Sequence, residues 1–282
     1  MAITAADVKK LRDLTGVGPA ECKNVLTETN GDIDKAVKVL KEKGLAAAEK
    51  RSDRATNQGR VSVKVADGKA VLVEIDTETD FVARNPDFIA LGDKIAGIVL
   101  AEGLSEPNEE LHGMVKDLAT KIRENMSLKS IKTVKAPVGA HIASYIHGDG
   151  AIGVVVCVSA DKPDAFNSED AQKFVFSLAM HVAAFNPAAI SADGLDAVKL
   201  KEQEEIFRKQ METDEKLKEK PANVLEGILK GKINKYISDI CFVDQAYIKN
   251  DKIKVGQALA ETGKTLGAKL KIESFCLLKV GG

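Results

Sequence analysis

Acidic side chains alternate along one stretch of the chain, in a pattern that could bind a metal ion. They are Glu74, Asp76, Glu78 and Asp80, and Phe81 follows the last of them. Alternate side chains of an extended chain share one face, and carboxylates gathered on one face of a strand are usually solvated. We therefore expect this acidic row to face solvent, and the aromatic ring beside it needs a separate explanation.

The segment that carries Phe81 lies between a predicted strand and a predicted helix. Alternating apolar residues over 71–75 predict a strand that stops near Asp76, and Pro86 suits the first turn of a helix. The segment between them is expected to be a short acidic loop, where an aromatic residue is unusual because loops run over the surface. Two interpretations remain open: Phe81 folds back and caps its own sheet, or it is a probe directed at another molecule.

His147 lies at the expected tip of a hairpin, where an imidazole gains little from burial. It is either a partner contact or a surface histidine without a role. The other histidines show no metal-ligand spacing, and no serine or cysteine lies in a recognisable nucleophile setting. The sequence therefore predicts neither a metal centre nor a covalent catalyst.

Two glycine-containing segments imitate nucleotide-binding motifs. Residues 148–153 fit a dinucleotide fingerprint in spacing but lie between two predicted strands, whereas the fingerprint needs a strand before it and a helix after it. Residues 263–265 imitate the end of a phosphate-binding loop, but Ala258 stands where an earlier glycine is required. We expect no bound cofactor at either segment.

Three short helices are predicted before residue 45. Apolar residues recur at helical spacing there, and Thr4 and Asp32 suit the capping positions of the first and third helices. Residues 45–59 are rich in charged and polar side chains and are expected to form a linker, helical at its start. Basic side chains of this linker could contact nucleic acid, although a solvated linker is the favoured interpretation. They are Lys50, Arg51 and Arg54.

From residue 59 onward, hairpins and helices follow in an order that occurs twice. Asp67-Gly68 predicts the turn of the first hairpin, and helices near residues 86–101 and 108–125 precede a further strand. After Pro137 a second hairpin, a helix and a late strand repeat this order. We therefore expect an α+β fold with two units, each an antiparallel sheet with helices on one side.

A helical hairpin is expected to interrupt the second unit at about residues 192–222. The segment is dense in both charges as far as Lys220, Pro221 breaks it, and a helix with a wide apolar stripe follows. This hairpin should project, either as a surface for a partner or a second copy, or as a solvated arm. The predicted division is residues 1–54 for the N-terminal helices, 55–139 for the first unit and 140–282 for the second.

Composition excludes several classes of protein. The 282 residues include 41 basic and 42 acidic side chains, for a net charge of -1, which argues against a protein whose main work is binding the phosphate backbone of nucleic acid. No apolar run reaches membrane-spanning length, and the N-terminus lacks a signal-peptide core. The four cysteines are widely separated, so reduced thiols and a cytoplasmic location are expected.

Several segments also occur in the order that characterises a known family. They are VKKLRDLTGVGPAECKNVL, NGDIDKAVKVL, TDFVARN, KIRENMSLKSI, SYIHGDGAIGV, AMHVAAFNPAAI and the closing GQALAETGKTLGAKLKIESFCLLKVGG. Together they resemble the bacterial elongation factor Ts family, and the combination of TDFV with MHVAA is specific to it. The resemblance extends over essentially the whole chain.

The resemblance implies a guanine nucleotide exchange factor for the GTPase elongation factor Tu, in its GDP-bound and nucleotide-free states, with no covalent catalysis and no direct contact with nucleic acid or membrane. It implies that the segment Thr79, Asp80, Phe81 and Val82 disturbs the magnesium site of the GTPase, and that His147 contacts a more distal domain. It also implies a ubiquitin-associated-like N-terminal module that contacts the nucleotide-binding domain, and a helical hairpin that is the family's dimerisation or coiled-coil element. The module's expected contact residues are Arg12, Gly18, Pro19 and Ala20.

The chain departs from the family pattern in two places. The family usually has two methionines where this chain has Pro19-Ala20, and some members carry a further C-terminal helix after the position of Gly282. Two other classes of function remain open. One is an enzyme that uses the acidic strand end and a histidine, and the other is a nucleic-acid or ubiquitin-type binding module based on the N-terminal helices.

Overall fold

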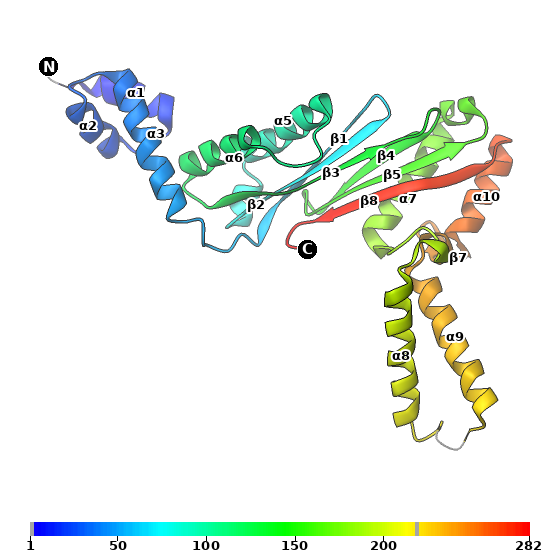
Figure 1. Cartoon of the computed structure of the whole chain (residues 1–282). Helices are drawn as coiled ribbons and strands as arrows, with labels where there is room; N and C mark the ends of the chain where they lie inside the picture. The colour runs from blue at the N-terminus through cyan, green and yellow to red at the C-terminus, as the bar shows by residue number, and fades with distance from the viewer. Residues whose placement is uncertain (1–2, 218–219) are drawn as a thin grey trace.

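The structure is a computed structural model that describes residues 3–217 and 220–282. A bundle of three helices lies at one end, two three-stranded antiparallel sheets pack against each other in the middle, and a pair of helices projects away from the second sheet (Figure 1). The α+β prediction is therefore confirmed. Within the described ranges, no helix is long and apolar enough to span a bilayer.

The N-terminal module consists of the three helices that the capping residues predict. Thr4 accepts a hydrogen bond from the backbone N–H of Asp7 and Asp32 one from that of Lys35, so each helix begins where expected. Gly16 ends the first helix with a φ of 69°, which favours glycine. The helices are α1 (Ala5–Thr15), α2 (Pro19–Glu28) and α3 (Ile33–Glu49), around a buried cluster of Leu11, Cys22, Val25, Leu26, Ala36 and Leu40.

The third helix also attaches the module to the rest of the protein. α3 packs against α6 (Glu109–Ile122), and Gly44 lies so close to it that a Cβ there would be 2.1 Å from Cγ2 of Thr120. Two ion pairs flank this contact: Lys41 with Asp117 at 3.0 Å, and Arg123 with Glu21 at 2.8 Å. The module is therefore docked on the first α+β unit as well as connected to it.

The first sheet has the strand order β1-β2-β3, with both pairs antiparallel. Two helices cover one of its faces and bury a core that includes Val73, Phe88 and Leu111. Asp67 and Gly68 form the predicted turn, with φ values of 50° and 68°. The elements are β1 (Gln58–Ala66), β2 (Lys69–Thr77), α4 (Asp80–Ala83), α5 (Pro86–Glu102), α6 and β3 (Met126–Lys135).

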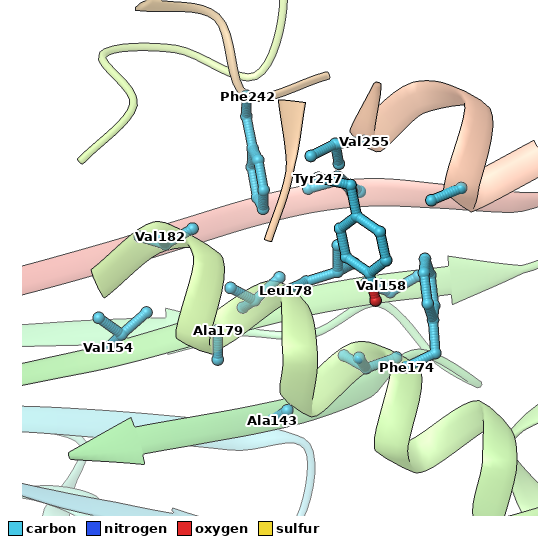
Figure 2. Close-up of a cluster of buried hydrophobic side chains, with 14 of the residues drawn as sticks. Ala143, Val154, Val158, Phe174, Leu178, Ala179, Val182, Phe242, Tyr247 and Val255 are labelled. Carbon is cyan, nitrogen blue, oxygen red and sulfur yellow. The ribbon is translucent and has the colours of Figure 1, made fainter. Parts of the chain in front are cut away.

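The second sheet has the order β4-β5-β8, again antiparallel. Its helix-covered face packs on α7, and Figure 2 shows Phe174, Leu178 and Tyr247 in this cluster of buried side chains. The main elements are β4 (His141–His147), β5 (Ile152–Ala160), α7 (Glu169–Phe185), α10 (Val255–Leu266) and β8 (Leu270–Lys279). Shorter elements lie between them: η1 (Pro163–Asn167), η2 (Ala192–Gly194), η3 (Phe242–Asp244), β6 (Ala246–Tyr247) and β7 (Asn250–Lys254).

The remaining face of each sheet packs against the other sheet. Val61 and Leu72 of the first sheet share a buried cluster with Val155 and Cys157 of the second. Because both faces of β2 are covered, its acidic side chains are buried too: Glu74 is 4% exposed and Asp76 is 2% exposed. The prediction that this acidic row faces solvent is wrong for these two residues, since nothing in the local sequence marks the arrival of a second sheet.

The projecting helices are α8 (Ala197–Thr213) and α9 (Ala222–Ile240), the latter ending well beyond the predicted limit of residue 222 (Figure 1). Residues 218–219, which fall in the predicted hairpin, lie outside the described residues. Arg208 of α8 pairs with Glu226 of α9 at 2.8 Å, and Phe207 meets Tyr236 edge to face. These contacts connect the two helices through adjacent residues of α8.

Candidate functional site

The segment after β2 forms one turn of helix, α4, in place of the predicted acidic loop. The hydroxyl oxygen of Thr79 accepts a 3.4 Å hydrogen bond from the N–H of Val82 and so caps the turn. Val82 and Ala83 are buried, Val82 within the first core, whereas Phe81 is 82% exposed. The structure therefore contradicts the interpretation that Phe81 caps its own sheet, and its role as a probe remains a prediction.

Asp80 is also on the outer side of this turn. Its carboxylate lies 3.2 Å from the guanidinium of Arg84, one helical turn further along, and both side chains are largely open to solvent. An exposed pair of this kind contributes little to stability. Asp80 can therefore exchange this partner for another at small cost.

Glu124 fixes the base of the turn from the other end of the first unit. The backbone N–H and the hydroxyl of Thr79 donate to its carboxylate at 3.1 and 2.8 Å, and the hydroxyl of Thr77 donates at 3.0 Å. Hydrogen bonds to a carboxylate are stronger than neutral ones, so three of them restrict the turn. Nothing in the sequence marks Glu124, because no local spacing connects a residue before β3 with the end of β2.

The neighbouring residues extend this support into the predicted linker. Glu78 accepts from the N–H of Asn125 at 2.6 Å and pairs with Arg54 at 3.3 Å. The side chain of Asn125 in turn donates to the backbone carbonyls of Ser52 and Arg54. Arg54, expected in a solvated linker, is thus tied to the segment that carries Phe81.

The buried acids of β2 belong to the boundary between the sheets. Ser130 donates to Oε2 of Glu74 at 3.1 Å, while Oε1 of Glu74 and Oδ1 of Asp76 are buried without a hydrogen-bond partner. Burial and the negative charge of Glu74 raise the pKa of Asp76 to about 6. Among the described residues, no group of three or more metal-binding side chains is placed to hold an ion.

His147 lies at the end of β4 and is exposed, as its predicted place on a hairpin requires. Its Nδ1 is 2.9 Å from the hydroxyl of Tyr145, which orients the ring, and Tyr145 packs edge to face on Phe176. The segment 148–153 comprises the turn between β4 and β5 and the first two residues of β5, and residues 263–265 lie in the last turns of α10. Neither segment opens a helix, which is the end that binds phosphate.

His181, within the MHVAA segment, is a core residue. It is fully buried, its Nε2 lies 2.9 Å from the side-chain oxygen of Gln245, and the N–H of Ile248 donates to its Nδ1. Burial lowers its pKa, so the ring is neutral and satisfied. This part of the family pattern therefore maintains the second core.

The predicted contacts of the N-terminal module lie around an open hollow between α1 and α2. Arg12, Pro19 and Ala20 line it, and Gly18 immediately precedes α2. Lys9 and Lys23 also line the hollow, so it combines apolar walls with positive charge. The predicted site residues thus lie in three places: this hollow, the turn at residues 79–82 and the hairpin at His147.

Comparison with known proteins gives full-length matches. A model of the Elongation factor TS family matches residues 78–282. The chain is 45% identical over 281 residues to elongation factor Ts of Treponema denticola, covering 100% of this chain and 99% of that protein. It is 40% identical to that of Treponema pallidum and 37% identical to that of Borrelia recurrentis, each again covering 100% of this chain.

Proposed function

The chain belongs to the elongation factor Ts family, and we propose that it promotes GDP release from elongation factor Tu during polypeptide elongation. The observation that carries the proposal is Phe81, 82% exposed on a turn whose base Glu124 holds. An exposed ring buries little area in this protein's own core, and we assign Phe81 to contact with another molecule.

Disturbance of a magnesium site accounts for the effect on the nucleotide. A GTPase holds its nucleotide phosphates with backbone donors, a lysine and Mg²⁺, and Mg²⁺ demands near-ideal octahedral geometry. The ring of Phe81 supplies volume that displaces the elements around that ion. Asp80, which releases Arg84 at small cost, supplies a carboxylate that competes near the water shell of the ion.

No covalent bond changes in this account, and the protein needs no cofactor of its own. The factor weakens nucleotide binding, and by linkage the nucleotide weakens binding of the factor to the same extent. The factor therefore leaves when a new nucleotide is bound. The alternative of an enzyme built on the acidic strand end has less support, because Glu74 and Asp76 are buried.

We assign the remaining predicted residues to affinity. The hollow beside Arg12 and the hairpin at His147 enlarge the contact with the GTPase, which acts in the cytoplasm. Neither nucleic acid nor membrane is a proposed partner. The helical hairpin is a candidate for self-association, because some of its apolar side chains are exposed: Val198, Ile206 and Val224.

The experiment is release of a fluorescent GDP analogue from purified elongation factor Tu, followed by stopped flow with excess unlabelled GDP. Substoichiometric amounts of this protein should accelerate release, since each molecule leaves one GTPase and acts on the next. Release at the intrinsic rate at every concentration of the protein would contradict the proposal.

A further inference from the structure

The turn that follows His147 is attached to the first sheet. Arg60 of β1 donates from its guanidinium to the backbone carbonyl of Asp149, and the N–H of Val61 donates to the carbonyl of Gly150 at 2.8 Å. The side chain of Arg60 also lies across Gly150, where a Cβ would be 2.4 Å from its Cγ. These contacts add polar interactions to the apolar packing between the sheets of the two units.

The backbone of this turn lies in the left-handed region. Gly148, Asp149 and Gly150 all have positive φ, at 59°, 53° and 98°. Asp-Gly favours this conformation, as at Asp67-Gly68, and the N–H of Ala151 closes the turn by donating to the carbonyl of Gly148 at 3.0 Å. The hydrogen bonds from β1 therefore fix where the turn lies against the first sheet.

The same strand connects this turn to the segment with Phe81. Arg60 is opposite Ile75 in the register of β1 and β2, and β2 leads directly into Thr79. β1 therefore contacts two segments: β2, which leads to Phe81, and the turn that follows His147. The segments that carry His147 and Phe81 are therefore both connected to this strand.

We propose that Arg60 is a positioning residue for the His147 contact: it fixes the turn after His147 against β1 so that the ring meets the GTPase while Phe81 is engaged. The inference rests on the proposed function. Arginine suits this task because its planar guanidinium keeps its donors in a fixed fork while its stem packs on Gly150. Lysine supplies the charge and a donor without that fork.

The first test concerns the free protein and needs no partner. Hydrogen–deuterium exchange of residues 148–151 should be faster in Arg60→Ala than in the wild type. Lys69→Ala removes a positive charge at the start of β2, at the opposite end of the β1–β2 hairpin from Arg60. It should leave the exchange of residues 148–151 unchanged. Unchanged exchange in Arg60→Ala would overturn the inference without affecting the proposed function.

The second test separates binding from the exchange step. In the GDP-release assay, Arg60→Ala should raise the concentration for half-maximal acceleration about fivefold, as expected for one lost hydrogen bond, and leave the maximal rate unchanged. Arg60→Lys should recover part of the loss. A lowered maximal rate, or no change in either quantity, would overturn the inference.

A double mutant shows whether Arg60 acts through His147. In a His147→Ala background, Arg60→Ala should have no further effect, because the contact that it positions is already absent. An equal loss in both backgrounds would mean that Arg60 acts elsewhere, and would overturn the inference. Failure of the wild-type protein to accelerate release is a different result, which contradicts the proposed function itself.

Discussion

Glu124 binds Thr79 with both of its carboxylate oxygens, one taking the hydroxyl and the other the backbone N–H. The two residues belong to opposite ends of the helical part of the first unit, so this contact closes the segment from β2 to β3 at its base. The exposed ring of Phe81 is therefore carried by a turn that is fixed before any partner binds. A preorganised contact avoids the cost of ordering the turn on binding.

Glu124→Ala should weaken both the fold and the exchange activity. It leaves the donors of Thr77 and Thr79 without their acceptor, which corresponds to a loss of about 1–3 kcal/mol in the free energy of unfolding. Urea denaturation measures this loss, and GDP release should show a lower maximal rate because the turn is no longer fixed. Glu124→Gln, which keeps one oxygen, should lie between Ala and wild type.

The control for charge is Glu102→Gln, an exposed acid at the end of α5. It should match the wild type in both measurements. If Glu124→Ala unfolds and exchanges like the wild type, the turn does not depend on Glu124.

Asp76→Asn should raise stability at neutral pH. Burial and the charge of Glu74 raise the pKa of Asp76 from 3.8 to about 6, so the carboxyl group of Asp76 binds a proton more tightly in the folded state than in the unfolded chain. The protonated carboxyl group therefore contributes to stability at low pH, and this contribution is lost as pH rises from about 4 to about 6 and stays absent above that. The lost free energy of unfolding is roughly 3 kcal/mol. The new amide can also donate to Oε1 of Glu74, which has no partner.

Thermal melts from pH 4 to pH 8 measure this effect as the difference between wild type and variant. The difference should grow with pH up to about 6 and then remain constant. Asp93→Asn, at an exposed position on α5, should show no such trend. A parallel pH dependence of Asp76→Asn and wild type would show that Asp76 titrates alike in the folded and unfolded states.

Gly44→Ala should loosen the docking of the N-terminal module. Alanine normally stabilises a helix by about 1 kcal/mol over glycine. Here the added Cβ would lie 2.1 Å from Cγ2 of Thr120, so we expect a net loss of stability and weaker binding to the GTPase. Adding Thr120→Ala removes the clashing methyl group, since Cβ of Thr120 is 3.5 Å away, and should restore both. The idea fails if the second change brings no recovery.

The helical hairpin should be removable without unfolding the second core. Its two ends meet at the base, where the N–H of Ala188 donates to the carbonyl of Ile240 at 2.9 Å and Cys241 pairs with Ala189. A short Gly/Ser linker in place of residues 196–238 should therefore leave the melting temperature close to that of the wild type. Sedimentation of both proteins shows whether the hairpin mediates self-association. Loss of cooperative melting would mean that the hairpin is part of the core.

Local chemistry made much of the fold predictable. Thr4, Asp32 and Pro19 mark where helices begin, and Asp67-Gly68 forms a hairpin turn. Helix capping and turn formation act within a few residues, so the sequence predicts them. The sequence leaves two interpretations of Phe81 open, a cap on its own sheet or a probe for another molecule. The structure excludes the cap, because Val82 packs in the core and Phe81 is exposed.

Several features that the sequence did not predict depend on contacts between distant segments. Glu74 and Asp76 are buried because a second sheet covers β2. Glu124 reaches Thr79, and Arg60 reaches Asp149, across the chain rather than along it. Periodicity and spacing carry no information on such contacts, because they report only which face of an element is apolar.

The most direct test of the account is Phe81→Ala. Because the ring is 82% exposed, the variant should melt like the wild type, whereas the maximal rate of GDP release at saturating concentration should fall by about tenfold or more. Val138→Ala, at a fully exposed apolar position between the two units, is the matched control and should change neither. A Phe81→Ala protein that melts normally and still releases GDP at the full rate would contradict the central claim.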